Sequence, residues 1–275
     1  MEMLVLASTR TIPAMLPESI RILYEAGFDS VDVSYNNIER FDIDYPSAYS
    51  YFRAALQEAS RLGVKPLTLH APWEEYYLIM LGKNIEYAVE EARILLDMAY
   101  SYGVDVVVFH PFSAQRVGES RVVWLNKKFF ALLADYSEHE GLSIVAIENA
   151  ERRKPWNSIA AITSLARSVG SQRLSVCIDV GHANINGYTP QRIGEELEGV
   201  EPICIHIHDN DGREDKHELP GTGTIDWEGI ASLESIVTAR YHVAEVDCNG
   251  SPRLCAVKAR IATTVISQLY LKYQA

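Results

Sequence analysis

Short apolar runs alternate along the chain with longer segments in which apolar residues recur at helical spacing. The short runs are rich in valine, isoleucine and leucine, which is typical of strands buried on both faces. Glycines follow several of the longer segments, as glycine often does at the end of a helix. The pattern predicts eight strands, at residues 3–7, 30–34, 66–70, 105–110, 143–148, 174–179, 203–208 and 241–246.

Eight helices are predicted between and after these strands, at residues 17–26, 46–62, 84–102, 121–140, 158–168, 190–198, 227–239 and 254–273. Regular alternation of strand and helix implies parallel strands joined by right-handed crossovers. Eight such units fit an α/β fold of the closed (β/α)8 type, a TIM barrel. An open doubly wound sheet would more naturally have a glycine-rich turn after its first strand, and residues 8–15 contain no glycine. We therefore expect a single TIM-barrel domain over residues 1–275.

Composition narrows the class of protein. The 275 residues are 48% hydrophobic and 23% charged, as in an ordinary globular protein, and the formal net charge is −12. This acidity disfavours binding to nucleic acids and to anionic membranes. The four cysteines form no CxxC pair, so we expect reduced thiols in a cytoplasmic protein and no disulfide framework. The N-terminus does not resemble a signal peptide, and no apolar run is long enough to predict a membrane span.

Ionisable side chains stand at the carboxyl ends of six predicted strands. They are His70, His110, Glu148, Asp179, His206 and Glu245. In TIM barrels this end of the barrel carries the active site. Carboxylates gathered there would repel one another, and a bound cation removes that repulsion. Residues two and four positions earlier are expected to fill the barrel interior; they are Thr68, Val106, Val108, Ile144, Ala146, Ser175, Cys177, Cys204 and Val243.

The densest group of such side chains follows the seventh strand. His206 and His208 lie two residues apart, so both point to the same side of a strand. The next loop adds four polar side chains, Asp209, Asp211, Asp215 and His217. Imidazoles and carboxylates at one strand end suit a divalent transition metal such as Mn²⁺, Zn²⁺ or Co²⁺.

These strand ends resemble the motifs of the xylose isomerase-like barrel superfamily, which includes sugar isomerases, ketose 3-epimerases of the D-tagatose type and endonuclease IV. Glu148 with Asn149 resembles the first glutamate ligand, and Glu245 the last. Residues 179–182 resemble the D-x-G-H motif, and residues 206–209 the H-x-x-D motif. The resemblance implies one tight metal site at Glu148, Asp179, His206 and Glu245. It places His182 beside the substrate and leaves His208 for contact with the substrate or with a ligand.

The similarity to endonuclease IV extends to nine residues, which in that family bind three zinc ions. The added candidates for metal binding are His70, His110, His182, Asp215 and His217, so up to three metals stay open. Two features depart from that family: the spacing from His206 to Asp215 is shorter, and His208 replaces the asparagine of its H-x-N-D motif. The sequence also shows no basic loop with interleaved aromatic residues suited to opening a duplex. Nucleic acid is therefore not the expected partner.

The resemblance implies a metal-dependent isomerase or epimerase of a small sugar, sugar phosphate or related polyol. Glu148 and Glu245 would move a proton at the carbon next to a metal-polarised carbonyl. Trp73 and Trp156 are candidates for stacking on the sugar, and Arg152, Arg153 and Lys154 for gripping a phosphate or carboxylate. Loop packing for the tryptophans and solvation for the basic run stay open.

Two alternative functions also stay open, zinc-dependent cleavage of abasic DNA and a non-catalytic barrel that binds a metabolite and keeps a structural metal. A homodimer is left open as the assembly.

Overall fold

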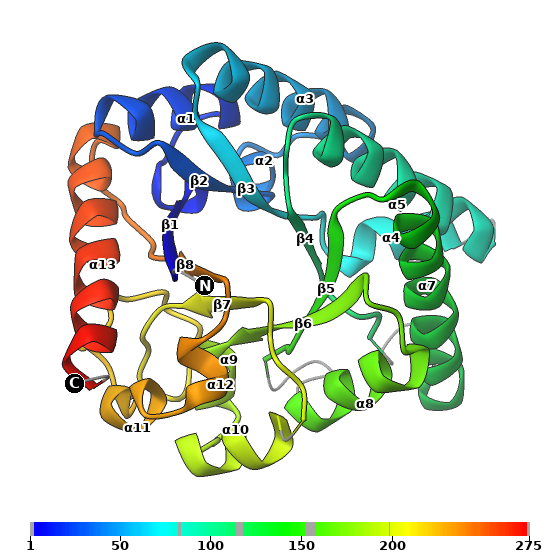
Figure 1. Cartoon of the computed structure of the whole chain (residues 1–275). Helices are drawn as coiled ribbons and strands as arrows, with labels where there is room; N and C mark the ends of the chain where they lie inside the picture. The colour runs from blue at the N-terminus through cyan, green and yellow to red at the C-terminus, as the bar shows by residue number, and fades with distance from the viewer. Residues whose placement is uncertain (1–2, 82–83, 114–117, 152–157, 198, 274–275) are drawn as a thin grey trace.

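Eight parallel strands close into a barrel in chain order, with β1 paired to β8, and helices surround it (Figure 1). The computed structural model describes residues 3–81, 84–113, 118–151, 158–197 and 199–273. The strands are β1 (Leu4–Ser8), β2 (Ser30–Ser34), β3 (Lys65–His70), β4 (Val106–Phe109), β5 (Ile144–Glu148), β6 (Leu174–Asp179), β7 (Cys204–Ile207) and β8 (Tyr241–Ala244). The predicted TIM barrel is confirmed.

The long helices begin and end close to the predicted positions, because amphipathic periodicity and terminal glycines define them locally. They are α1 (Leu16–Glu25), α3 (Tyr45–Leu62), α5 (Ile85–Ser101), α7 (Glu119–Glu140), α8 (Ile159–Val169), α10 (Pro190–Leu197) and α13 (Pro252–Tyr273). Shorter helical segments are η1 (Thr9–Thr11), α2 (Asn36–Glu39), α4 (Glu74–Leu81), α9 (Val180–Ile185), α11 (Trp227–Ala231) and α12 (Glu234–Val237).

The single helix predicted over residues 227–239 is wrong. The segment divides into α11 and α12, because Leu233 adopts an extended backbone (φ −81°, ψ 108°) and packs against the core. Helix α4 is an element that the sequence pattern did not predict. Its residues EEYYLIML are apolar on several sides, so no one-sided apolar stripe marks the helix.

The barrel interior is filled by alternate residues of the strands. The buried cluster consists of Leu6, Val106, Val108, Ala146, Cys177, Cys204, Tyr241 and Val243, with Ile144 packed against it, which confirms most of the predicted interior. Ser175 departs from the predicted interior. It is only half-buried, and its hydroxyl donates to the carbonyl of Glu201 (3.4 Å). Intervening strand residues, such as Val107, Ile147 and Ile205, face outward into the larger core beneath the helices.

One acidic side chain lies among these apolar residues. Asp32 of β2 is fully buried and accepts hydrogen bonds from Ser8 (2.7 Å) and Thr68 (2.8 Å). Burial and the nearby carboxylate of Glu245 raise the pKa of Asp32 to about 6. The interior is therefore polar just below the carboxyl end of the barrel.

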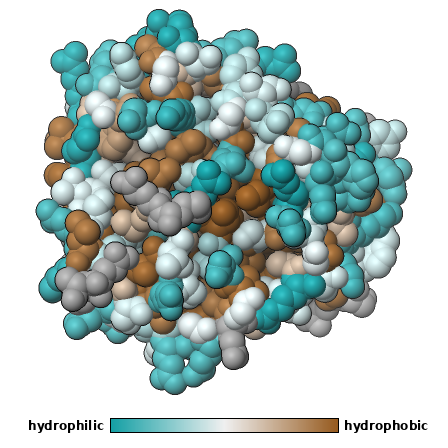
Figure 2. Space-filling view, in the orientation of Figure 1, coloured by the Kyte–Doolittle hydropathy of each residue, from teal (hydrophilic) through white to brown (hydrophobic). Residues whose placement is uncertain are grey.

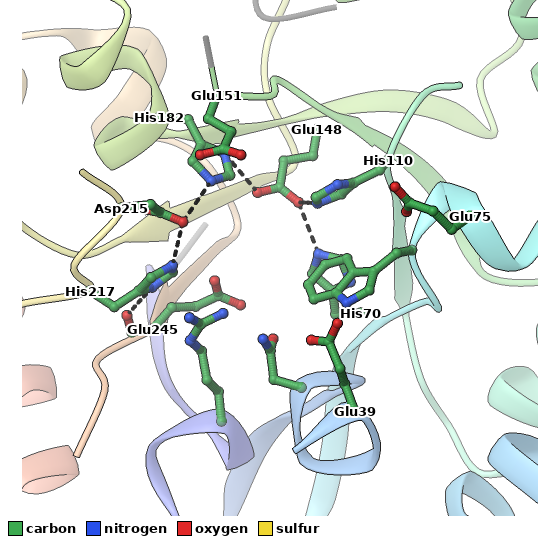
Figure 3. Close-up of a pocket in the computed structure, with 13 residues that line it drawn as sticks. Glu39, His70, Glu75, His110, Glu148, Glu151, His182, Asp215, His217 and Glu245 are labelled. Carbon is green, nitrogen blue, oxygen red and sulfur yellow. Dashed lines mark hydrogen bonds and ion pairs between the residues drawn. The ribbon is translucent and has the colours of Figure 1, made fainter. Parts of the chain in front are cut away.

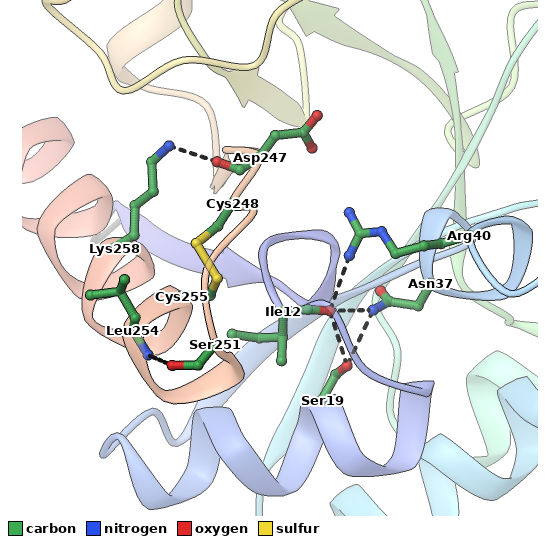
Figure 4. The surroundings of a disulfide bond; sticks show 10 residues. All are labelled: Ile12, Ser19, Asn37, Arg40, Asp247, Cys248, Ser251, Leu254, Cys255 and Lys258. Carbon is green, nitrogen blue, oxygen red and sulfur yellow. Dashed lines mark hydrogen bonds between the residues drawn. A yellow bond between two sulfur atoms is a disulfide. The ribbon is translucent and has the colours of Figure 1, made fainter.

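The expectation that the cysteines are reduced is wrong for one pair. Cys248 and Cys255 form a disulfide (Figure 4), while Cys177 and Cys204 are free and buried. The chain turns at Gly250 and enters α13 at Pro252, which brings the two Cα atoms to 5.6 Å, within disulfide range. A search for CxxC spacing misses a pair that a turn brings together.

Among the described residues, no helix is long and apolar enough to cross a membrane. On the face seen in the space-filling view, hydrophilic side chains predominate at the periphery, and hydrophobic ones gather towards the middle (Figure 2).

Candidate metal centre

The six predicted strand-end side chains converge at the carboxyl end of the barrel. Figure 3 shows four of them, His70, His110, Glu148 and Glu245. Parallel pairing sets the register there: Asp179 lies beside His206, and His70 beside Val108. The glutamates, the aspartate and His206 are at most 3% exposed. Side chains that the sequence separates by up to 175 positions therefore form one buried polar cluster.

Glu148 lies between two imidazoles from neighbouring strands. The Nε2 atoms of His70 and His110 are each 3.0 Å from its Oε2 atom. Nδ1 of His70 lies 2.8 Å from the carbonyl oxygen of Ala71 and donates its proton there, so Nε2 is the ring nitrogen that faces the glutamate. We call His70, His110 and Glu148 the first group.

His206 lies close to the other three residues expected to hold the tight metal. Its Nδ1 atom is 3.1 Å from Oε1 of Glu148 and 3.7 Å from Oε2 of Glu245. Asp179, His206 and Glu245 offer ligand atoms that all lie within 4.8 Å of one another. We call Glu148, Asp179, His206 and Glu245 the central group; Glu148 belongs to both groups.

The third set of ligands, which we call the outer group, consists of His182, Asp215 and His217. Oδ2 of Asp215 lies 3.4 Å from Nε2 of His182 and 3.0 Å from Nε2 of His217. A hydrogen bond from Nδ1 to a backbone carbonyl fixes each imidazole. Nδ1 of His182 lies 2.9 Å from the carbonyl oxygen of Asn149, and Nδ1 of His217 lies 2.7 Å from that of Glu245. Metal-binding histidines commonly have this arrangement, with one nitrogen on a carbonyl and the other free.

The D-x-G-H and Glu-Asn motifs have a structural cause. Asp179 caps the N-terminus of α9 by accepting from the backbone of His182 (2.6 Å), which places the His182 side chain over the site. Asn149 accepts from the backbone N–H of Asp179 (2.8 Å) and donates to its carbonyl (3.0 Å). The ends of β5 and β6 are thereby joined, and Glu148 is held beside Asp179.

The residues present fit a divalent cation. Oε1 of Glu245 and Oδ1 of Asp215 are buried oxygens without a hydrogen-bond partner among the described residues. Burial alone would raise the pKa of Glu148, but the imidazoles of His206 and His110 lower it well below its usual range. Burial alone would lower the pKa of His206, and the carboxylates of Glu245 and Glu148 raise it well above its usual value. Positive charge is therefore strongly favoured at this position, and a bound divalent cation would supply it.

A pocket of about 390 Å³ opens onto these groups. Its lining includes the predicted Trp73, His70, His110, His182, Asp215, His217, Glu148 and Glu245. His208 is fully buried and is not part of the lining. Trp156, Arg152, Arg153 and Lys154 lie outside the described residues.

Sequence patterns missed several residues of the pocket. Arg10 follows β1 and forms an ion pair with Asp247 (2.9 Å), and three glutamates, Glu39, Glu75 and Glu151, also line the pocket. Arg10 could have been found as the charged residue after the first strand. The glutamates carry no such signal, because acidic residues are common in exposed loops.

Asp209 of the H-x-x-D motif holds the loop that carries Asp215 and His217. Its carboxylate accepts from the backbone of Gly221 (2.8 Å) and from the indole of Trp227 (2.8 Å). A side chain at Gly223 would collide with Asp209 and Asn210, which explains the glycine there. Asp211 is half-buried and pairs with Lys216 (2.6 Å).

A family model for xylose isomerase-like TIM barrels matches residues 20–233, which is more than half of the chain. The chain belongs to this family. It is 26% identical over 183 residues to the uncharacterized protein MJ1311 of Methanocaldococcus jannaschii, covering 64% of this chain and 61% of that protein. It is 22% identical over 239 residues to a probable endonuclease 4 of Mycoplasma mobile, covering 75% and 81%. The match to the uncharacterized protein y4fM of Sinorhizobium fredii spans only 50% of that relative.

Two solved structures share the fold over almost their whole length. A D-tagatose 3-epimerase-like protein superposes with a TM-score of 0.78 at 20% identity, covering 99% of this chain and 100% of that one. The IolI protein, whose structure holds a zinc atom, gives 0.76 at 18% identity, covering 98% and 99%. At these identities the likeness shows the fold, and epimerases and isomerases are among the proteins that share it.

Proposed function

We propose that this protein is a divalent-metal-dependent isomerase or epimerase of a small sugar or related polyol. The observation that supports it is the position of His206, whose Nδ1 atom lies 3.1 Å from Glu148 and 3.7 Å from Glu245. Two carboxylates on either side of a cation site provide both the ligands and the groups that move protons. Solved structures with the same fold include an L-ribulose 3-epimerase and a D-psicose 3-epimerase.

The central group would hold one metal tightly, through Glu148, Asp179, His206 and Glu245. Its mixed nitrogen and oxygen atoms suit Mn²⁺, Zn²⁺ or Co²⁺ better than a metal that prefers oxygen alone. When bound, the metal polarises the substrate carbonyl and so acidifies the neighbouring C–H bond. The first and outer groups are candidates for further metals.

Glu148 and Glu245 would take up and return the proton at the carbon beside that carbonyl. Both carboxyl groups are ionised at neutral pH, because nearby imidazoles overcome the effect of burial on their pKa values. Glu148 comes from β5 and Glu245 follows β8, so the two residues approach the substrate from different sides. A group on each face favours epimerisation, in which one residue removes the proton and the other delivers it to the opposite face.

The described part of the pocket favours a small substrate without a phosphate; the basic run at residues 152–154 lies outside it. Glu39, Glu75 and Glu151 line it, and among the described lining residues Arg10 is the only lysine or arginine. Arg10 is already paired with Asp247, so its charge is largely offset. Trp73 would pack against the apolar face of the sugar, and His182 would hold a hydroxyl or carbonyl oxygen.

The test combines metal analysis with turnover in heavy water. We expect about one tightly bound metal per chain after mild dialysis, and deuterium at the carbon next to the carbonyl when candidate ketoses are turned over. Turnover with complete retention of the original hydrogen would indicate a hydride shift and would remove the proton-transfer role of the glutamates. Absence of bound metal would contradict the proposal as a whole.

Cleavage of abasic DNA is the second candidate. The observation that favours it is the presence of three candidate ligand groups, the first, central and outer groups, together with the match to a probable endonuclease 4. The glutamates of the pocket oppose it, because they repel a phosphate backbone. Three zinc equivalents per chain, with cleavage of an abasic oligonucleotide and no sugar turnover, would establish this function in place of the first.

A further inference from the structure

His208 is a buried histidine that the proposed chemistry does not use. It follows β7 and has no exposed surface, and it does not line the pocket. Its Nε2 atom lies 3.1 Å from Oδ1 and 3.2 Å from Oδ2 of Asp179, a member of the central group. The same atom is 3.6 Å from Oδ1 of Asp215 in the outer group. One ring nitrogen therefore faces carboxylates of both groups.

The other nitrogen of His208 distinguishes it from His70, His182 and His217, but not from His206, whose Nε2 atom also lacks a hydrogen-bond partner among the described residues. Nδ1 has no hydrogen-bond partner among the described residues, whereas Nδ1 of His70, His182 and His217 each donates to a backbone carbonyl. Nε2 is therefore the nitrogen of His208 that has an acceptor, and it donates to the carboxylate of Asp179.

Two neighbours hold the ring in this position. The imidazole of His217 stacks on it, with ring centroids 3.7 Å apart and an interplanar angle of 24°. On the other side, a Cβ atom at Gly181 would overlap the imidazole of His208. The glycine of the Asp-Val-Gly-His segment therefore provides the space that His208 occupies.

We propose that His208 is a positioning residue for the metal centre: its Nε2–H group orients the carboxylate of Asp179, and Gly181 is required because it admits the ring. This inference rests on the proposed function insofar as Asp179 binds a metal. Groups that orient a ligand typically change metal affinity by about 10- to 100-fold.

The test compares two replacements of nearly equal size. His208→Gln keeps an N–H donor close to the position of Nε2, and His208→Met does not. Metal affinity is measured by competition with a chromophoric chelator, and cobalt spectra report the ligand set. We expect His208→Met to weaken binding by about 10- to 100-fold, with an unchanged number of metals, and His208→Gln to stay close to the wild type. Melting of the metal-free variants checks that each one is folded.

A double-mutant cycle tests the role of Gly181. Gly181→Ala should weaken metal binding in the wild-type protein, because the ring of His208 must move. The same change should add nothing to His208→Ala, because the ring is gone.

Equal losses in the Gln and Met variants, or additive effects in the cycle, would overturn the inference. Loss of a metal equivalent in both His208 variants would identify His208 as a direct ligand instead. A wild-type protein that binds no metal would refute the proposed function itself.

Discussion

Nδ1 of His206 faces Glu148 and Glu245 at distances that a shared cation would satisfy. Only two positions away, His208 has a different role, because its ring reaches Asp179 and Asp215 and not the two glutamates. Alternation along a strand puts both histidines on one side, but the position along the barrel axis decides which carboxylates each can reach.

His206→Ala is expected to weaken metal binding by roughly 100-fold or more, since it removes a ligand and leaves buried carboxylates without a counter-charge. Isothermal titration of the metal-free protein with Zn²⁺ or Mn²⁺ measures the loss. His139→Ala is the matched control, because His139 is an exposed histidine on the outer helix α7 and is not among the ligands. Unchanged affinity in His206→Ala would show that the central group is not the metal site.

At the scale of elements, β8 and α13 are joined by a buried histidine. Nδ1 of His242 accepts from the hydroxyl of Tyr270 (3.2 Å), and its Nε2–H group donates to the carbonyl of Ala239 (3.1 Å). Both nitrogens are satisfied only when the ring is neutral. Burial lowers the pKa of His242 to about 4.

This contact predicts a loss of stability in mild acid. The unfolded chain takes up the proton near pH 6.5, whereas the folded protein resists it until about pH 4, so the stabilisation is complete above 6.5 and declines between those values. The shift corresponds to about 3 kcal/mol of unfolding free energy. In urea unfolding, His242→Gln should be the less stable protein at pH 7, and the gap should narrow as the pH falls to 4.5. A gap independent of pH would contradict the assignment.

At the scale of the whole molecule, the carboxylates buried at or just below one end of the barrel include Asp32, Glu148, Asp179 and Glu245. These carboxylates belong to strands β2, β5 and β6 and to the end of β8. Their mutual repulsion therefore destabilises the closed barrel as a whole. A cation bound by the folded state alone reverses this effect.

Metal removal is therefore expected to destabilise the entire domain. A metal present at 100 times its dissociation constant adds about 2.7 kcal/mol to the unfolding free energy. For a chain of this size, we expect chelation to lower the melting temperature by roughly 5 to 10 °C. Calorimetry of chelator-treated and reconstituted protein measures the shift, with the His206→Ala variant as the control that should not respond. Identical melting of the two wild-type forms would contradict a metal bound at the barrel end.

The sequence alone determined the barrel and the row of ionisable strand ends, because both follow from local periodicity. Strands and helices have different periods, and parallel strands all end at one rim. The positions of His70, His110, Glu148, Asp179, His206 and Glu245 at the ends of apolar runs therefore suffice to assign them to one end of the barrel.

Only the tertiary structure decided how these residues are grouped. The register between strands brings His70 and His110 to Glu148, while the loop held by Asp209 brings Asp215 and His217 to His182. The Cys248–Cys255 disulfide, the break between α11 and α12, and the buried Asp32 likewise depend on turns and packing. Such contacts join residues far apart in the chain or across a turn, and their geometry is set by the closed barrel and not by local sequence period.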